Sequence, residues 1–151
     1  MDRTANSIWR GSIQGGKGEI STGSGALKAV PYSFATRFEG TPGTNPEELI
    51  AAAHSGCYAM ALSGALGQAK FEAKQLDVRA TVTIAKVGDG WSISHSRLSL
   101  KAEIPGIDKN KFLEIAEAAK KNCPVSKVLN AEISLVAELI SSSIKDTGPQ
   151  A

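Results

Sequence analysis

The sequence predicts an α+β fold, and three observations support this class. The segments with strand periodicity come as a group of three, then a pair after one long apolar helix, and a last one after a second helix. The chain of 151 residues contains 15 glycines and only 5% aromatic residues, which favours many turns and close packing. This length is enough to bury a hydrophobic core without staples. We therefore expect a single domain over residues 1–151, with an ordered core over about 9–140 and a frayed tail over 141–151.

Composition and charge exclude several classes of protein. With 42% hydrophobic and 21% charged residues the chain is not wholly disordered. The net charge is only +2 and no block of basic residues occurs, so we expect neither a nucleic-acid nor a membrane-surface partner. The first residues show no basic segment followed by an apolar one, so we expect no signal peptide and a cytoplasmic protein. The apolar stretch Leu49–Leu66 is as long as a membrane span, but it contains His54 and small polar residues. A helix buried on all sides inside the protein is the better interpretation.

Three strands are predicted before the long helix. Ser7–Ile13 and Gly18–Gly25 are weak strand candidates that glycines interrupt. Alternating apolar residues predict a clearer strand over Tyr32–Glu39. The segment Gly11–Gly18 nearly spells a phosphate-binding loop, but it ends in glycine where that motif needs Ser or Thr, and a strand follows instead of a helix. We therefore predict a hairpin turn there and no nucleotide site.

A long helix is predicted from Pro46 to about Leu66. Thr44 or Asn45 can cap its N-terminus, Pro46 suits the first helical position, and the two glutamates that follow lie where the helix dipole favours anions. Gly67 is expected to end the helix.

A hairpin is predicted after this helix. Apolar residues alternate over Val78–Ile84, Gly88–Gly90 forms the turn, and a second strand starts at Trp91. The apolar positions of the second strand change parity, which predicts a β-bulge near His95–Arg97.

The last part of the chain is predicted to contain two helices and a strand. After a break at Pro105-Gly106, Asp108 can cap a helix whose apolar face carries Phe112, Ile115, Ala116 and Ala119. A short helix begins at Pro124, and Glu132–Ile140 is predicted to be the last strand.

The two cysteines are candidates for chemistry. Cys57 lies in the middle of the long helix, and Cys123 immediately precedes Pro124 at the start of a helix. Backbone N–H groups and the helix dipole at such a position lower the pKa of a thiol. One disulfide at most is too few for a secreted disulfide scaffold. The two residues are 123 − 57 = 66 positions apart, so by spacing alone both could equally be small buried hydrophobic residues.

His54, Arg37 and Glu47 are further candidates with ordinary structural alternatives. His54 precedes Cys57 by three residues, so the two share a helix face and could form a cysteine–histidine nucleophile, although a packing role is simpler. An arginine close to Cys57 would give a thiolate a permanent cation, and a buried arginine would need a carboxylate such as that of Glu47. By residue type alone, Arg37 could be a solvated strand residue and Glu47 a helix-terminal anion. The cysteines and histidines lack the close spacing of a zinc site, so we expect no metal.

Three segments strongly resemble the osmotically inducible protein C / organic hydroperoxide resistance family. They are Tyr32–Gly40, Thr44–Leu62 with its Asn-Pro-Glu…His-Ser-Gly-Cys pattern, and Asn122–Ser126, which reads Asn-Cys-Pro-Val-Ser. The order of elements agrees from about Trp9 to Leu139. The position of the arginine, in the segment before the long helix, resembles the osmotically inducible branch.

This resemblance implies an α+β, OsmC-like fold in which antiparallel sheets pack on long central helices of an intertwined homodimer. It also implies a thiol-dependent, peroxiredoxin-like peroxidase with no metal or organic cofactor, active in oxidative and osmotic stress. Cys57 is then the peroxidatic cysteine, Cys123 the resolving cysteine, and Arg37 and Glu47 the activating pair. The substrate is an organic hydroperoxide, and a lipoyl-type dithiol is the implied external reductant.

Helix geometry adds an expectation about where the site lies. Glu47 and Cys57 are ten residues apart on one predicted helix, about 15 Å along its axis. Either the first turn of the helix bends away, or the partner subunit supplies Glu47, and Arg37 with it. We favour the second arrangement, in which the active site lies between subunits. The expected walls of an apolar substrate pocket are Phe38, Tyr58 and Met60.

Two other functions fit the same residues. A hydrolase could use Cys57 with His54. A non-catalytic module for redox sensing or ligand binding could use the same fold, with cysteines that become oxidised but do not turn over.

Overall fold

The computed structural model describes residues 1–140 of the chain. The chain forms two compact units, one of residues 1–50 and the other from residue 51 onward. Each unit contains one three-stranded sheet, so the mixed α+β class is confirmed. The single domain over residues 1–151 stays a prediction, and the predicted frayed tail over 141–151 lies outside the described residues.

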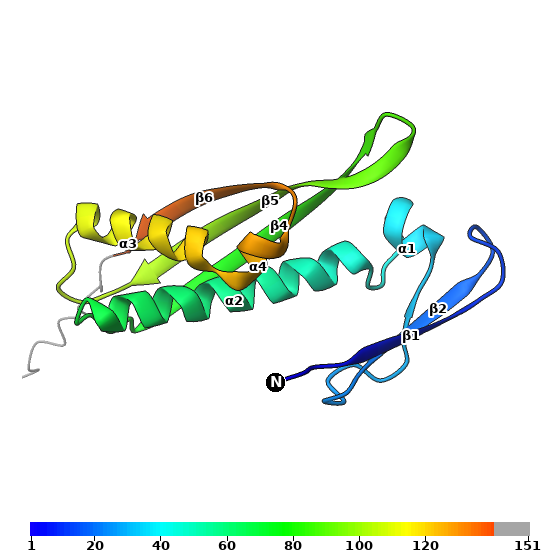
Figure 1. Ribbon diagram of the computed structural model, residues 1–151, viewed down its shortest axis with the longest axis horizontal. Coiled ribbons are helices and arrows are strands. Elements are labelled where there is room, and N and C mark those ends of the chain that lie inside the picture. The colour runs from blue at the N-terminus through cyan, green and yellow to red at the C-terminus, as the bar shows by residue number, and fades with distance from the viewer. Residues whose placement is uncertain (141–151) are drawn as a thin grey trace, which may run out of the picture. The chain divides into compact units, whose positions relative to one another are not determined.

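The first unit contains the sheet β1-β2-β3, with all pairs antiparallel (Figure 1). Its strands are β1 (Ala5–Arg10), β2 (Lys17–Thr22) and β3 (Val30–Tyr32). Between the first two strands, the Gly16 amide donates to the Ser12 carbonyl at 2.8 Å. The glycine-rich segment is therefore the turn of a hairpin, as predicted.

The predicted strand over Tyr32–Glu39 is wrong, because β3 ends at Tyr32 and the helix α1 (Phe34–Phe38) follows. A capping box starts this helix: the Thr36 amide donates to Ser33 Oγ at 3.3 Å, and the Ser33 amide donates to Thr36 Oγ1 at 2.9 Å. The two phenylalanines at its ends lie one turn apart, with ring centroids 4.9 Å from each other. Residues spaced by four satisfy strand alternation and helical periodicity equally, which explains the error.

The long helix α2 (Pro46–Gln68) begins where the sequence predicts and ends two residues later than expected. Asn45 caps it, since its Oδ1 accepts a hydrogen bond of 2.9 Å from the Glu48 amide. The expectation of burial on all sides is wrong for the single chain: a stripe at intervals of four residues is buried, while Met60 is 79% exposed. The buried stripe consists of His54, Tyr58, Leu62 and Leu66.

By length and composition alone, α2 could cross a membrane, with a mean hydropathy of 1.3 over its most apolar window. Core helices of soluble proteins pass the same test. The fully buried His54 ring is hydrogen-bonded to two serines from other elements, which is the environment of a core helix.

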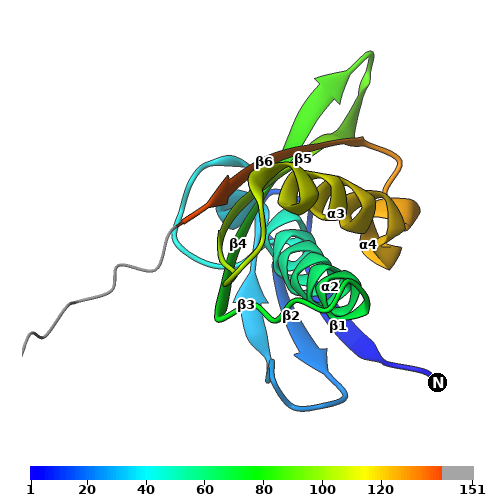
Figure 2. The ribbon, with the colours of Figure 1, turned by 90° about the vertical axis from the view of Figure 1, so that its left-hand side faces the viewer.

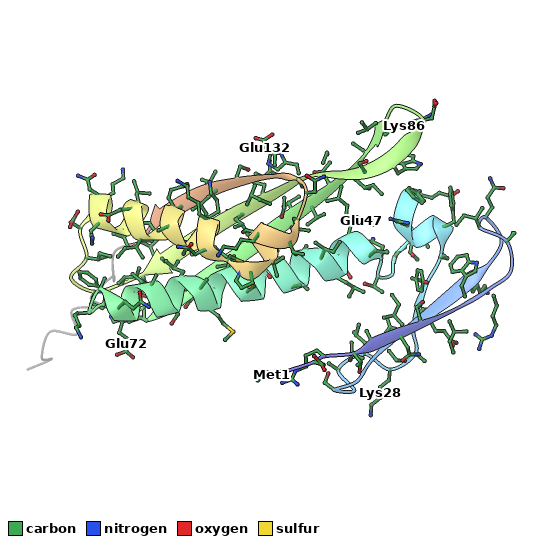
Figure 3. All side chains as sticks on the ribbon, in the orientation of Figure 1. Met1, Lys28, Glu47, Glu72, Lys86 and Glu132 are labelled. Atoms are coloured by element: carbon green, nitrogen blue, oxygen red, sulfur yellow. The ribbon has the colours of Figure 1, made fainter. Side chains whose placement is uncertain are left out.

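The second unit contains the sheet β4-β5-β6. Strands β4 (Gln75–Val87) and β5 (Gly90–Glu103) form the predicted antiparallel hairpin, with Lys86 near its tip (Figure 3). Strand β6 (Glu132–Leu139) instead runs parallel to β5, so the expectation of purely antiparallel sheets is wrong. Between them the chain passes through α3 (Lys109–Asn122) and α4 (Pro124–Val128), and such a helical crossover returns the chain in the same direction.

A β-bulge in β5 sets which side chains face the core. Thr83 pairs with His95 and Ile84 with Ile93, so Ser94 is the extra residue, next to the predicted position. Beyond the bulge, the even-numbered residues of β5 point inward. These buried residues are Ser96, Leu98, Leu100 and Ala102.

The core of the second unit lies between this sheet and the helices α2 and α3, which run along one face of it (Figures 1 and 2). Asp108 caps α3 by accepting a hydrogen bond of 3.0 Å from the Lys111 amide, as predicted. The predicted apolar face of α3 is buried and packs in the same core; it comprises Phe112, Ile115, Ala116 and Ala119.

We expect Leu98→Ala to lower the free energy of unfolding by about 2–5 kcal/mol, because the side chain is fully buried and its loss leaves a cavity. Val136→Ala in the neighbouring strand is the control, since Val136 is 63% exposed. Urea unfolding followed by circular dichroism measures both. Equal effects of the two substitutions would contradict the core described above.

Candidate active site

The structure brings the two cysteines together. Cys57 lies half-buried in the middle of α2, and Cys123 is fully buried at the junction of α3 and α4. Their thiols are hydrogen-bonded to each other. Two sulfurs 66 residues apart in the chain are thus adjacent, and a small movement would let them form a disulfide.

Proline fixes the position of Cys123. A residue that precedes proline is disfavoured in the helical conformation, and Cys123 has φ −58° and ψ 122°. Its amide still closes the last turn of α3 by donating to the Ala119 carbonyl at 2.9 Å, while Pro124 starts α4. The sulfur is therefore held at the start of α4, where backbone amides point toward it.

These amides change the acidity of the Cys123 thiol. Burial raises its pKa, but hydrogen bonds from the Ser126 amide, the Cys57 thiol, the Ser126 hydroxyl and the Val125 amide outweigh burial. The net pKa of Cys123 is below that of an ordinary thiol, as expected from its place at a helix start.

The pKa of Cys57 moves in the opposite direction. Burial raises it most, the Val125 amide lowers it, and the neighbouring Cys123 raises it again. Within one chain Cys123 is therefore the thiol that loses its proton more readily, and Cys57 is the one that keeps it. For Cys57 to become the nucleophile, a positive charge has to stabilise its thiolate.

Arg37 and Glu47 form a tight ion pair in the first unit. Arg37 Nη2 donates to Glu47 Oε1 at 2.7 Å, and Nε lies 3.2 Å from both carboxylate oxygens. Arg37 belongs to α1 rather than to a strand, and Glu47 lies at the N-terminal end of α2 (Figure 3). The carboxylate side chain is only 8% exposed but that of the arginine is 35% exposed, so Glu47 orients a guanidinium that still reaches solvent.

A cavity of about 310 Å³ lies beside this arginine, within the first unit. Its lining is largely aromatic and consists of Trp9, Ile13, Tyr32, Ser33, Phe34, Arg37, Phe38 and Pro46. Of the three expected wall residues, Phe38 lines this cavity. Tyr58 was wrongly expected there: its ring is fully buried in the second unit and its hydroxyl donates to the Ala116 carbonyl at 3.2 Å. Met60 is exposed on α2 and is not among the lining residues.

His54 is fully buried and both of its ring nitrogens are hydrogen-bonded to serines. Nδ1 lies 2.7 Å from Ser96 Oγ, and Nε2 lies 2.8 Å from Ser126 Oγ. Burial lowers the pKa of His54, so the ring is neutral at neutral pH. With both nitrogens occupied by serines, the ring does not form a catalytic pair with Cys57.

Sequence reasoning missed these two serines as members of the site. One signal was available for each. Ser96 is a polar residue in phase with the even-numbered apolar residues of β5, and Ser126 lies one helical turn after Cys123. Across residues 1–140, no group of three or more His, Cys, Asp or Glu side chains is placed to hold a metal ion.

Comparisons with known proteins identify the family of the chain. The family model described as OsmC-like protein matches residues 38–138. Peroxiredoxin OsmC of Escherichia coli is 50% identical over 133 residues, which covers 88% of this chain and 93% of that protein. The organic hydroperoxide resistance protein OhrB of Bacillus subtilis is 28% identical over 131 residues, covering 85% and 93%.

Solved structures show the same fold. The crystal structure of OhrB of Bacillus subtilis matches with a TM-score of 0.66 at 27% identity, covering 91% of this chain and 98% of that one. An OsmC-like protein of unknown function from Vibrio cholerae matches with a TM-score of 0.72 over 93% and 99%, and at 16% identity it shows the fold alone. Because the family model covers more than half of the chain and a relative is 50% identical over 88% of it, this protein belongs to the OsmC/Ohr family.

Proposed function

We propose that this protein is a thiol-dependent peroxidase that reduces organic hydroperoxides to alcohols. The contact between the Cys57 and Cys123 thiols is the observation that carries the proposal. Relatives named peroxiredoxin OsmC and organic hydroperoxide resistance protein support a peroxidase-type redox function.

In the first step, Cys57 is the peroxidatic residue. Its thiolate attacks one oxygen of the hydroperoxide, the O–O bond breaks, and the other oxygen leaves as an alkoxide that takes up the proton released when Cys57 ionised and becomes the alcohol. Cys57 is oxidised to a sulfenic acid. The guanidinium of Arg37, oriented by Glu47, stabilises the Cys57 thiolate and the negative charge on the leaving oxygen.

In the second step, Cys123 is the resolving residue. Its thiolate attacks the Cys57 sulfur of the sulfenic acid; the S–S bond forms, the S–O bond breaks, and the oxygen leaves as hydroxide and becomes water. Their existing contact supports a fast step, because the reacting sulfurs need no large backbone movement to meet. The disulfide protects Cys57 from irreversible oxidation.

An external dithiol completes the cycle by two thiol–disulfide exchanges. Family resemblance suggests a lipoyl-type dithiol as this reductant. The proposed reaction needs no metal or organic cofactor, and the cytoplasm, where thiols are kept reduced, is the compartment in which such a cycle works.

The proposed active unit is a homodimer in which Arg37 and Glu47 of one chain serve Cys57 of the other. Three observations support this. Glu47 and Cys57 lie ten residues apart on the helix α2, a separation of about 15 Å along its axis. Within the single chain, burial and Cys123 raise the pKa of Cys57, so a cation from outside that chain has to stabilise its thiolate. The exposed face of α2, with Gly56, Met60 and Gly64, is small and apolar enough to contact a second copy closely.

The cavity beside Arg37 supports an organic substrate. Its aromatic lining can hold an apolar substituent while the guanidinium meets the peroxide oxygens. Hydrogen peroxide has no such substituent, so an organic hydroperoxide is the better substrate.

The two alternative functions, a hydrolase and a redox-sensing module, differ from the peroxidase in the residues they need and in turnover. A hydrolase needs His54 as the base of Cys57, but the two ring nitrogens are bound to Ser96 and Ser126. A redox-sensing module would oxidise once and not turn over with a dithiol.

Replacing the two cysteines separates these possibilities. We expect Cys57→Ser to reduce consumption of cumene hydroperoxide with reduced lipoamide to the uncatalysed background. Cys123→Ser should still consume the first equivalent and then accumulate sulfinic acid at Cys57, measured by mass spectrometry. Turnover by the Cys57→Ser variant would refute the proposed nucleophile, and no turnover by the wild type would favour the redox-sensing module.

Arg37 and Glu47 should be needed for the first step. We expect Arg37→Lys to lower kcat/KM by about 10²-fold, because lysine keeps the charge but loses the two-pronged contact with Glu47. Arg10→Lys is a matched control, since Arg10 pairs with Glu19 on the surface of the same unit. Steady-state kinetics measure both, and equal losses would speak against a specific role of Arg37.

Mixed dimers can show whether the site is shared. Cys57→Ser and Arg37→Ala homodimers should both be inactive. If Arg37 serves the cysteine of the other chain, unfolding and refolding the two variants together restores one intact site in each mixed dimer. Since half of the dimers in an equal mixture are mixed, peroxidase activity should recover to about a quarter of wild type. No recovery in mixed dimers verified by native mass spectrometry would place the residues in the same chain.

A further inference from the structure

His54 is a buried titratable residue that the proposed peroxidase steps do not use. Its ring is completely removed from solvent on the core face of α2, in a stripe otherwise made of Tyr58, Leu62 and Leu66. A buried imidazole needs hydrogen-bond partners, and it has one on each nitrogen. One of these partners, Ser126, also contacts Cys123.

The hydrogen bonds form a chain with a defined direction. The Ser126 hydroxyl donates to the Cys123 sulfur, which leaves its oxygen to accept from His54. This direction assigns the His54 proton to Nε2; the bare Nδ1, which lies 2.7 Å from Ser96 Oγ, then accepts from that hydroxyl. Ser96 on β5, His54 on α2 and Cys123 are fully buried, and Ser126, which joins His54 to the thiol, is partly buried.

We propose that His54 is a positioning residue for the resolving cysteine. By donating to the Ser126 oxygen, it fixes the Ser126 hydroxyl on the sulfur of Cys123 and so favours the thiolate that attacks the Cys57 sulfenic acid. This inference rests on the proposed function, and it assigns His54 to the second step, not to the attack on peroxide.

The step balances without another reactant. The Cys123 thiolate attacks the Cys57 sulfur, the S–S bond forms, and the S–O bond breaks. The oxygen leaves as hydroxide, which takes a proton from solvent and becomes water. The oxidising equivalents come from the hydroperoxide consumed in the first step.

The surroundings of Cys123 allow its titration to be read clearly. The titratable groups that face it are the Cys57 thiol and the Tyr58 phenol from α2, with neutral His54 acting through Ser126. Burial raises the pKa of Tyr58 most, followed by Glu117 of α3 and Cys123, so the phenol stays protonated while the thiol titrates.

The first test measures the Cys123 thiol in the Cys57→Ser background, where it is the sole cysteine. The readout is the pH dependence of thiolate absorbance and of alkylation rate. Ser126→Ala removes the hydrogen bond to the charged sulfur, and His54→Leu no longer holds the Ser126 hydroxyl on it. We therefore expect each substitution to raise this thiol pKa by about one unit. Ser126→Thr, which keeps the hydroxyl, should restore the value, and Ser55→Ala on α2 is the neutral control.

The second test follows a single turnover of the protein with both cysteines by rapid quenching and mass spectrometry. His54→Leu and Ser126→Ala should form the Cys57 sulfenic acid at the wild-type rate but the disulfide more slowly near neutral pH, by up to about tenfold, because a one-unit rise in pKa lowers the thiolate fraction by at most that factor. They should also accumulate more sulfinic acid at Cys57 in each cycle.

These outcomes distinguish the two proposals. If folded His54→Leu and Ser126→Ala variants keep the wild-type thiol pKa and disulfide rate, His54 has no positioning role even though the peroxidase stands. If the wild type consumes no hydroperoxide, the proposed function fails, whereas the titration still reports the chain of hydrogen bonds. Should His54→Leu not fold, Ser96→Ala provides the test: without the Ser96 hydroxyl the ring can move its proton to Nδ1, and the thiol pKa should again rise. An unchanged pKa in that variant overturns the inference.

Discussion

The turn at Cys123 is the constraint on which the candidate site depends. Proline at position 124 ends α3, starts α4, and holds the cysteine between them in a conformation that helices do not use. The apolar face of α3 packs in the core next to this turn, and the buried stripe of α2 packs in the same core and positions Cys57. The contact between the two sulfurs is therefore a consequence of core packing, and substitutions that loosen the core act on the chemistry as well as on stability.

The electrostatics of the pair divide the two cysteines into different roles. Amides at the start of α4 favour charge on Cys123, and the same charge raises the pKa of its neighbour Cys57. Two thiols in contact cannot both ionise easily. A cation that approaches only Cys57 makes Cys57 the thiol that ionises more readily, and we propose that Arg37 supplies this cation. Glu47 keeps that guanidinium oriented and leaves part of it exposed to solvent.

Local signals in the sequence predicted most of the elements but not their long-range relations. The caps at Asn45 and Asp108 were predictable because a cap and its helix are adjacent in sequence. The helix α1 was missed because phenylalanines spaced by four also fit a strand. The parallel direction of β6 and the two hydrogen bonds of His54, which span 42 and 72 residues, depend on tertiary packing. Cys57, Cys123, Arg37 and Glu47 were named from a family resemblance, since residue spacing alone left their roles open.

The identity of residue 54 is hard to explain by stability alone. Every other member of the buried stripe of α2 is aromatic or aliphatic. Replacing a buried polar residue and its partners with apolar groups of similar shape is often neutral or stabilising, because the hydrogen bonds do little more than offset desolvation. A histidine at this position also demands serines at two other places in the fold. Losing any one member of such a network leaves a buried polar group without its hydrogen bond, which lowers stability. The last hydrogen bond of this network joins Ser126 to the sulfur of Cys123. Its placement is therefore better explained by what it does for the thiol than by what it adds to the core.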